Sequence, residues 1–372
     1  MMGTVCELDR CTGCSLCVGK CPKNAIHIED NIKAYNAQID ERLCVDCGIC
    51  REICPSNHPL EKRAPVLWRQ GWALDEHIHS EGSSGGIATA LAKAFVENGG
   101  IVCSCVFHKG NFVFDFASSV DAVKRFAGSK YVKSDPTGIY PKIGRLLQEG
   151  KKVLFIGLPC QAAAVQRYTR NHAYLYVVDL ICHGTPSPKI LRRFLTEKGH
   201  DIETMRDIKF RRKAHFYLSD GHKGIRPPSV FDQYTYAFLN ALCYTKACYA
   251  CQYAETSRVS DITLGDSWGS KLPLEEQRKG VSLILCQTEK GRELLDMADL
   301  QLEDVDVEAA VANNKQLQRP SSRPDVYDRF YAEFLRTNDF SRAVNRCYPV
   351  VFFKQAVKAL LVRGGIMRGR NG

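Results

Sequence analysis

The chain has few features of an exported or membrane-spanning protein. Its longest apolar run, Tyr174 to Cys182, is interrupted by Asp179 and is well short of the roughly 18 residues of a membrane span. The first residues carry acidic side chains and cysteines, where a secretory signal would have a basic start and an apolar stretch. We therefore expect a cytoplasmic protein without a transmembrane segment, in which thiols stay reduced.

The sequence also lacks the common nucleotide-binding motifs. Neither G-x-G-x-x-G nor G-x-x-x-x-G-K-[ST] occurs in its 372 residues, so an ordinary nicotinamide dinucleotide fold or a P-loop site has no support. The 51 basic and 41 acidic residues give a net charge of +10. That excess suggests a nucleic-acid binder, but no recognition motif accompanies it, and we expect no nucleic-acid partner.

What the chain has in abundance is cysteine, 18 residues in all, although a protein of this size does not need disulfides for stability. Two copies of C-x2-C-x2-C-x3-C-P lie near the N-terminus. Three thiolates on a tight loop bind one four-iron cluster, and the fourth is directed to the partner cluster. A zinc site would leave the third cysteine and the proline unexplained. The pattern, which resembles bacterial dicluster ferredoxins, predicts one 4Fe-4S cluster on Cys11, Cys14, Cys17 and Cys54 and another on Cys44, Cys47, Cys50 and Cys21.

The rest of the chain alternates helical patterns with short apolar runs, which favours an α/β fold around a parallel or mixed sheet. The polar stretch from Asn57 to Glu81 has no sustained period and predicts a linker that lies on the next domain. Helices are expected over Ser84 to Glu97 and after Cys160, Pro188 and Glu289. Strands are expected over Ile101 to Phe107, Phe112 to Phe116, Val153 to Gly157, Tyr174 to Ile181 and Ile262 to Gly265.

Four further cysteines are candidates for a third site. Cys248 and Cys251 form a C-x2-C pair, which is compatible with zinc, a redox dithiol or half of a cluster site. Cys160 and Cys182 follow two expected strands, and the carboxyl ends of such strands converge on the binding crevice of α/β sheets. From the residues alone, ligand and buried structural cysteine are equally good interpretations of Cys160 and Cys182.

Five stretches, taken in order, resemble the beta-subunit family of coenzyme F-420 hydrogenase and dehydrogenase, which uses a deazaflavin coenzyme. They are Ser80 to Gly86, Gly128 to Val132, Gly157 to Ala162, Asp179 to Gly184, and Cys248 to Cys251 followed by Leu264 to Trp268. The resemblance runs from about residue 78 to 330 and implies an iron-sulfur flavoprotein with FAD beside a 4Fe-4S cluster. It also implies that the third cluster is held by Cys160, Cys182, Cys248 and Cys251, with Cys243 as the substitute ligand. The remaining cysteines, Cys6, Cys103, Cys105, Cys286 and Cys347, are expected to pack as small hydrophobes.

The candidate flavin site rests on small residues near a helix start. An N-terminal serine cap is the simpler explanation of the serines, but the family resemblance favours FAD phosphate binding. The expected cofactor-binding residues are Ser83, Ser84, Gly85, Gly86, Gly128, Ser129, Lys130 and Asp266. Lys130 and His183 are weak catalytic candidates, for which a solvated lysine and a core or surface histidine are the simpler interpretations. The basic run Lys209 to Lys213 reads first as a solvated edge strand and second as a contact for an anionic partner or substrate.

These observations predict a small α+β dicluster ferredoxin-like domain followed by a larger α/β domain with a mixed sheet. The expected boundaries are 1–58 for the ferredoxin-type domain, 78–155 and 156–335 for two parts of the flavin domain, and 336–372 for a basic tail. From Tyr348 on, the chain has basic but no acidic residues, which indicates a terminal packing helix or a membrane-surface or partner contact.

The expected function is a redox relay. A ferredoxin or other one-electron donor reduces the clusters, and FAD passes electron pairs to an organic acceptor, which is the deazaflavin or a substrate linked to polysaccharide biosynthesis. The direction can also be reversed. The alternatives are a non-catalytic electron-transfer subunit that works with a redox partner subunit, and an iron-sulfur sensor that binds nucleic acid.

Overall fold

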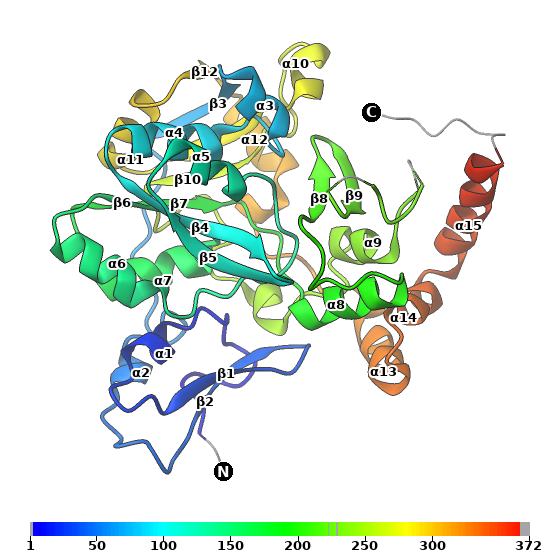
Figure 1. Cartoon of the computed structure of the whole chain (residues 1–372), viewed down its shortest axis with the longest axis horizontal. Helices are drawn as coiled ribbons and strands as arrows, with labels where there is room; N and C mark the ends of the chain where they lie inside the picture. The colour runs from blue at the N-terminus through cyan, green and yellow to red at the C-terminus, as the bar shows by residue number, and fades with distance from the viewer. Residues whose placement is uncertain (1–2, 222, 228–229, 365–372) are drawn as a thin grey trace.

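An eight-stranded mixed sheet forms the centre of the larger part of the chain (Figure 1). The computed structural model describes residues 3–221, 223–227 and 230–364. The strands are β3 (Leu67–Ala73), β4 (Ile101–His108), β5 (Asn111–Ala117), β6 (Val153–Ile156), β7 (Leu175–Leu180), β10 (Ile262–Asp266), β11 (Ser282–Cys286) and β12 (Leu300–Glu303). Their order is β12-β3-β11-β10-β7-β6-β4-β5. The central strands β4, β6, β7 and β10 are parallel, whereas the flanking strands join antiparallel.

Helices cover both faces of this sheet, which explains why the central strands β6 and β7 are mainly apolar and almost wholly buried. The covering helices include α4 (Ile87–Glu97), α6 (Ile139–Gln148), α7 (Pro159–Thr169) and α11 (Glu289–Asp296). Side chains of β6 alternate between the two layers. Val153 and Phe155 pack in the cluster that contains α6 and α7, and Leu154 and Ile156 pack in the cluster that contains α4 and α11. The strands expected over residues 101–107 and 112–116 are confirmed and form an antiparallel hairpin. The strands expected at 153, 174 and 262 are also confirmed, with small shifts at their ends.

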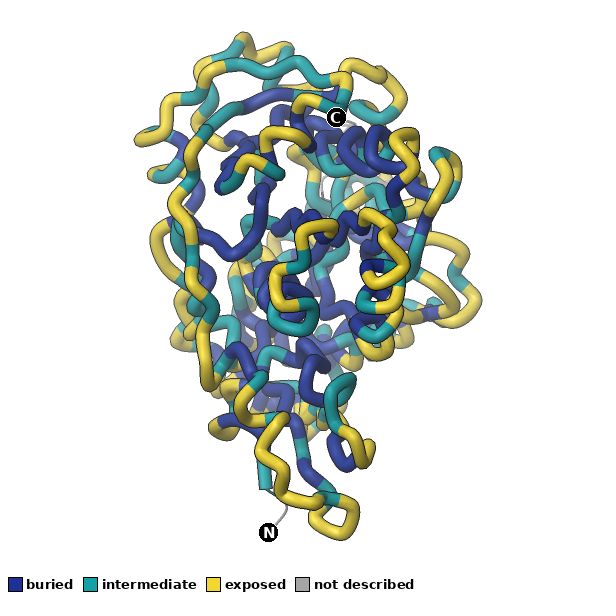
Figure 2. The backbone as a smooth tube through the Cα atoms, turned by 90° about the vertical axis from the view of Figure 1, so that its left-hand side faces the viewer, coloured by how far each residue is buried: buried dark blue, intermediate teal, exposed yellow. Residues whose placement is uncertain are grey.

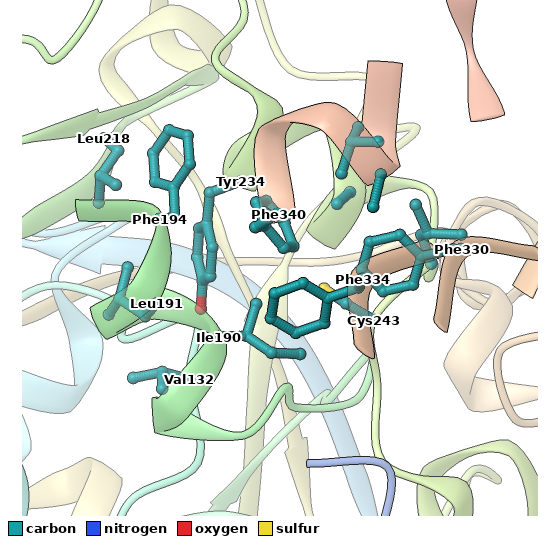
Figure 3. Packing of buried hydrophobic residues seen from close by; sticks show 14 of the residues in the cluster. Val132, Ile190, Leu191, Phe194, Leu218, Tyr234, Cys243, Phe330, Phe334 and Phe340 are labelled. Atoms are coloured by element: carbon teal, nitrogen blue, oxygen red, sulfur yellow. The ribbon is translucent and has the colours of Figure 1, made fainter. Parts of the chain in front are cut away.

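A second core, rich in aromatic rings, lies beside the sheet (Figure 3). Phe340 has no exposed surface and contacts the rings of Phe194, Tyr234, Phe330 and Phe334. The elements of this region are α8 (Pro188–Glu197), β8 (Lys209–Arg212), β9 (His215–Ser219), α9 (Gln233–Leu239), α13 (Tyr327–Thr337), α14 (Phe340–Cys347) and α15 (Pro349–Arg363). Shorter helices elsewhere are α3 (Glu76–Glu81), α5 (Val120–Val123), α10 (Leu274–Lys279) and α12 (Val307–Asn313).

The N-terminal unit is small and packs against α6 and α7 of the larger part (Figure 1). It consists of α1 (Leu16–Lys20), α2 (Ile49–Glu52) and an antiparallel hairpin of β1 (Ile26–Asp30) and β2 (Tyr35–Ile39). The buried hydroxyl of Tyr140 in α6 donates to the carbonyl oxygen of Cys14 at 2.5 Å. Ser187 Oγ donates to Asp30 Oδ2 at 2.6 Å on the other side of the unit. The expected fold class, a small N-terminal domain followed by a larger α/β domain with a mixed sheet, is confirmed.

The expected linker from Asn57 to Glu81 is wrong, because it contains β3, which lies between β11 and β12 in the sheet. Gln70 of β3 is buried, and its amide donates to the carbonyl oxygen of Asp304 while its oxygen accepts from Ser267. A polar residue inside a sheet breaks the apolar alternation that identifies strands from sequence. The residues at which the expected parts of the flavin domain begin or end, 78, 155 and 335, lie in α3, β6 and α13.

The C-terminal segment begins as three packed helices. Phe352 and Ala359 of α15 are buried, whereas Val350, Phe353 and Leu360 are exposed. The end of the expected basic tail, residues 365–372, lies outside the described residues. Of the helices in the described part of the chain, none combines the length and the apolar character needed to cross a bilayer.

Replacing Phe340 with alanine should lower the free energy of unfolding by about 3–5 kcal/mol, because a buried ring leaves a cavity among four other rings. Chemical denaturation followed by near-ultraviolet circular dichroism measures the change. Leu335→Ala on exposed α13 surface is the matched control and should change stability by about 0.5 kcal/mol or less. Similar losses in both variants would contradict this account of the core.

Candidate functional site

Two small cavities in the N-terminal unit are lined by cysteines from both copies of the motif. One is lined by Cys21, Cys44, Cys47 and Cys50. The other is lined by Cys6, Cys11, Cys14, Cys17 and Cys54. The fourth cysteine of each copy thus lies with the first three of the other copy, which is the arrangement that two four-iron clusters require.

Backbone amides around these cysteines donate hydrogen bonds to sulfur. The amides of Gly13, Ala25 and Asp46 donate to the Sγ atoms of Cys11, Cys21 and Cys44, respectively, at 3.2–3.4 Å. Gly13 adopts a positive φ of 65°, and a Cβ there would lie 3.0 Å from the Tyr35 ring, so this turn needs glycine. Hydrogen bonds of this kind stabilise thiolate ligands and tune cluster potentials.

Cys6 is a cysteine of this site that sequence reasoning missed. Hydrogen bonding between its thiol and the sulfurs of Cys11 and Cys54 raises the pKa of Cys6. The same interaction lowers the pKa of Cys11, and it lowers the pKa of Cys54 to about 6. Cys6 precedes the motif and has no spacing signal of its own. Only the fold of the N-terminal unit brings it beside the second cavity.

The structure brings the four cysteines of the expected third site together from three separate places in the chain. Cys160 opens α7, Cys182 follows β7, and Cys248 and Cys251 lie in and just after a 3-10 helix at Lys246–Ala250. Burial, and then the charges of Cys248, Cys251 and Cys160, raise the pKa of Cys182. Burial is also the main cause that raises the pKa of Cys251 to about 12. The amide of Thr185 donates to Cys248 Sγ at 3.4 Å.

Cys243, the expected substitute ligand, lies elsewhere. It has no exposed surface and packs in the aromatic core beside Phe330 and Phe334 (Figure 3). Cys103, Cys286 and Cys347 also pack in hydrophobic clusters, as expected.

A buried lysine lies between the third group of cysteines and the N-terminal unit. Lys133 is 5% exposed, and its Nζ lies 3.5 Å from Cys160 Sγ. Burial alone lowers the pKa of Lys133, but the surrounding thiolates raise it above its ordinary value. These thiolates belong, in order of strength, to Cys160, Cys248, Cys14 and Cys182. Cys14 of the N-terminal unit is therefore a neighbour of the third group.

A cavity of about 310 Å³ lies at the carboxyl ends of the parallel strands, where α/β proteins bind ligands. Residues after β6, β7 and β10 line it, and Cys182 belongs both to this lining and to the third group of cysteines. The expected site residues in the lining are Ser83, Ser84, Gly86, Gly128, Ser129, Lys130, His183 and Asp266. Gly85 is not among them, because it packs against β3 and its amide donates to Ser282 Oγ.

The serines before α4 do not cap the helix. The helix begins at Ile87, three residues later than expected, and its N-cap is Gly86 with a φ of 78°. Ser83 Oγ accepts from the Ser129 amide at 2.8 Å, and Ser84 Oγ donates to the Val281 carbonyl oxygen at 2.8 Å. The first bond joins the two small-residue loops of the cavity lining, and the second joins the serine loop to the residue before β11.

The charged side chains of the cavity are held by neighbours. Lys130 Nζ donates to the carbonyl oxygens of Phe126 and Ala127, and burial lowers its pKa. Asp266 accepts two hydrogen bonds from Arg211, at 2.7 and 2.9 Å. The Arg211 side chain is 6% exposed, so the expectation of a solvated edge strand is wrong for this residue. The carboxylate of Asp266 holds the guanidinium in the cavity wall, and no local sequence pattern indicates this pairing.

His183 faces the cavity and is exposed there. Desolvation of the imidazole by the surrounding protein lowers the pKa of His183. The charge of Asp266 offsets only part of this effect, so the imidazole is neutral near pH 7. Cys105 packs against two hydrophobic clusters, as expected, and also lines the cavity.

In residues 3–221, 223–227 and 230–364, no three side chains of His, Cys, Asp or Glu converge closely enough to bind a single metal ion.

Three family models match the chain. The N-terminal and C-terminal models of the coenzyme F420 hydrogenase/dehydrogenase beta subunit match residues 69–137 and 150–309 and together cover more than half of the chain. A 4Fe-4S dicluster domain model matches residues 10–58.

Individual relatives agree with these models. A coenzyme F420-dependent sulfite reductase from Methanocaldococcus jannaschii is 24% identical over 94% of this chain, which spans 56% of that protein's length. One component of an ion-translocating oxidoreductase complex from Methanosarcina acetivorans is 41% identical over 51 residues, which are 14% of this chain and 17% of that protein.

A solved structure shares the fold. It is a chain of the F420-reducing [NiFe] hydrogenase complex from Methanosarcina barkeri, with 20% identity and a TM-score of 0.50 over 74% of this chain and 95% of that chain. The family models, the relatives and the fold agree, and the chain belongs to the coenzyme F420 hydrogenase/dehydrogenase beta-subunit family, with a 4Fe-4S dicluster domain at its N-terminus.

Proposed function

We propose that this chain is an iron-sulfur flavoprotein oxidoreductase that exchanges electrons between a one-electron partner and a two-electron organic carrier. The observation that supports it most is the continuity of the sites. The two cysteine groups of the N-terminal unit lead through Cys14 to the third group, and Cys182 connects the third group to the cavity. A row of this kind is what stepwise electron transfer requires.

The one-electron partner docks at the N-terminal end of the molecule. Cys47 is exposed there, and Leu43, Val45 and Ile49 expose apolar surface around it. Figure 2 shows exposed segments at this end of the molecule. Small apolar patches around a cluster are suited to transient contact with a ferredoxin or with a partner subunit.

The third group of cysteines holds a third 4Fe-4S cluster. In support, the four thiols come from three places in the chain and interact with one another. The amide of Thr185 donates to Cys248 Sγ, as amides of the N-terminal unit donate to cysteine sulfurs there. The neighbouring ammonium of Lys133 compensates the negative charge of such a cluster.

The cavity holds FAD. When bound, the flavin supplies the conversion between one-electron and two-electron steps. The N-terminal residues of α4, Ile87, Ala88 and Thr89, line the cavity and suit phosphate groups, because the first amides of a helix attract anions. Arg211 and Asp266 shape the wall, and neutral His183 accepts or returns a proton when the carrier changes its oxidation state.

Coenzyme F420 is the first organic carrier to test, because the sulfite reductase relative is dependent on it. A second candidate function is an electron-transfer subunit without turnover of its own. It is favoured by the hydrogenase chain, which belongs to a complex, and by the length of the sulfite reductase, of which this chain spans 56%.

Anaerobically purified protein should contain about twelve irons, in three four-iron clusters. Cys182→Ala should lose about four of them, because the third group loses a ligand. Iron and sulfide analysis, with electron paramagnetic resonance (EPR) of the reduced protein, measures the loss. Cys243→Ala is the matched control and should retain all twelve, and eight irons in the unaltered protein would contradict the third cluster.

Ser83→Ala should weaken FAD binding about fivefold to tenfold, because the Ser129 amide loses its acceptor and the two loops separate. Fluorescence titration of the flavin-depleted protein measures the dissociation constant. The hydroxyl of Ser80 donates to the carbonyl oxygen of nearby His77, and Ser80→Ala should leave the constant unchanged. A protein that binds no FAD at micromolar concentration would overturn the flavin assignment.

Anaerobic mixing with coenzyme F420 tests the direction and the carrier together. The reduced coenzyme should bleach the flavin and then reduce the clusters, or the reduced protein should reduce the oxidised coenzyme. Absorbance separates these steps. Clusters and flavin that exchange electrons with ferredoxin but with no organic carrier would instead support the electron-transfer subunit.

A further inference from the structure

Lys133 is a buried charged side chain that belongs neither to the sheet nor to the cavity wall. Its residue is 5% exposed, and its backbone amide donates to the carbonyl oxygen of Pro186 at 3.0 Å, which fixes the start of the side chain. In the described part of the chain, no carboxylate pairs with its ammonium, and its polar contact is Cys160 Sγ at 3.5 Å. Burial of an unpaired ammonium costs several kcal/mol, so another negative charge must compensate it.

Among the described residues, the groups positioned to do so are thiolates of two different cysteine groups. Cys160, Cys182 and Cys248 belong to the third group, whereas Cys14 belongs to the N-terminal unit. A four-iron core with four thiolates carries a net charge of about −2 when oxidised and about −3 when reduced. A fixed cation beside it therefore favours the reduced form.

We infer that Lys133 is a positioning residue that sets the reduction potential of the third cluster and places it above that of a cluster without a buried cation. The inference rests on the proposed third cluster. The ammonium interacts more strongly with Cys160 than with Cys14, so it stabilises an added electron more on the third cluster than on the neighbouring cluster of the N-terminal unit. It thereby favours transfer from the N-terminal unit to the cluster beside the cavity. Each cluster takes up one electron from the reductant, and no covalent bond forms or breaks.

The test is an EPR-monitored redox titration of the intact protein with dithionite and mediators. Lys133→Met removes the charge and keeps most of the side-chain volume. It should make reduction of the third cluster at least tenfold less favourable, which is about 59 mV for a one-electron couple. The spectrum of Cys182→Ala, which lacks this cluster, identifies its signal.

Three comparisons make the result specific. Lys133→Arg keeps the charge, so the reduction potential of the third cluster should stay close to that of the unaltered protein. Lys133→Gln keeps a hydrogen-bond donor to Cys160 but loses the charge, so its potential should be as low as that of Lys133→Met. The cluster on Cys44, Cys47, Cys50 and Cys21 serves as an internal reference. In the described part of the chain, the thiols that interact with Lys133 are other cysteines. Lys198→Met, a half-buried lysine that donates to Ser341 Oγ in the aromatic core, should leave all potentials unchanged.

The possible results separate the two proposals. Twelve irons in Lys133→Met with an unchanged potential would overturn the role of Lys133 and leave the proposed function intact. Eight irons in the unaltered protein would overturn the third cluster itself. If Lys133→Met fails to assemble the third cluster, Lys133→Gln carries the test, and an unaltered potential in that variant also overturns the inference.

Discussion

The close docking of the N-terminal unit against α6 and α7 is the contact on which the arrangement of sites depends. The buried hydroxyl of Tyr140 holds the Cys14 carbonyl oxygen at 2.5 Å, and Thr137 Oγ1 donates to Ser15 Oγ at 3.1 Å one residue further on. Lys246, which lies two residues before Cys248, forms an ion pair with Asp9 of the N-terminal unit at 2.6 Å. These contacts hold the cluster motif against the first turn of α7, which carries Cys160. A more loosely tethered unit would leave the cysteine groups without a fixed separation.

The direction of the sheet strands determines where the cavity lies. Because β6, β7 and β10 are parallel, the residues that follow them meet at one edge, and both Cys182 and Asp266 reach the cavity from there. Helices on both faces leave this edge as the open side. The cavity and the third cysteine group therefore share a wall, and Cys182 and Thr185 contribute to both.

The cysteine groups offer an explanation for the positive net charge of the chain. Three clusters with about −2 each would reduce the net charge of +10 to roughly +4. Lys133 shows how such compensation works locally, because its ammonium has thiolates rather than carboxylates around it. The excess of basic residues is then a property of a protein that holds anionic groups, and nucleic acid is not needed to explain it.

The sequence by itself determined the cluster motif of the N-terminal unit, the α/β class and most strands of the sheet, because cysteine spacing and apolar runs are local patterns. The pairing of the two motif copies, with Cys54 beside the first and Cys21 beside the second, also follows from spacing and proline. Only the tertiary structure brought Cys6 to the second cavity, β3 into the sheet, Arg211 onto Asp266 and Lys133 onto Cys160. Each of these depends on contacts between segments distant in the chain or on a polar residue that is buried against its ordinary preference. Such residues resemble surface residues in the sequence, and packing alone shows which buried partner satisfies them.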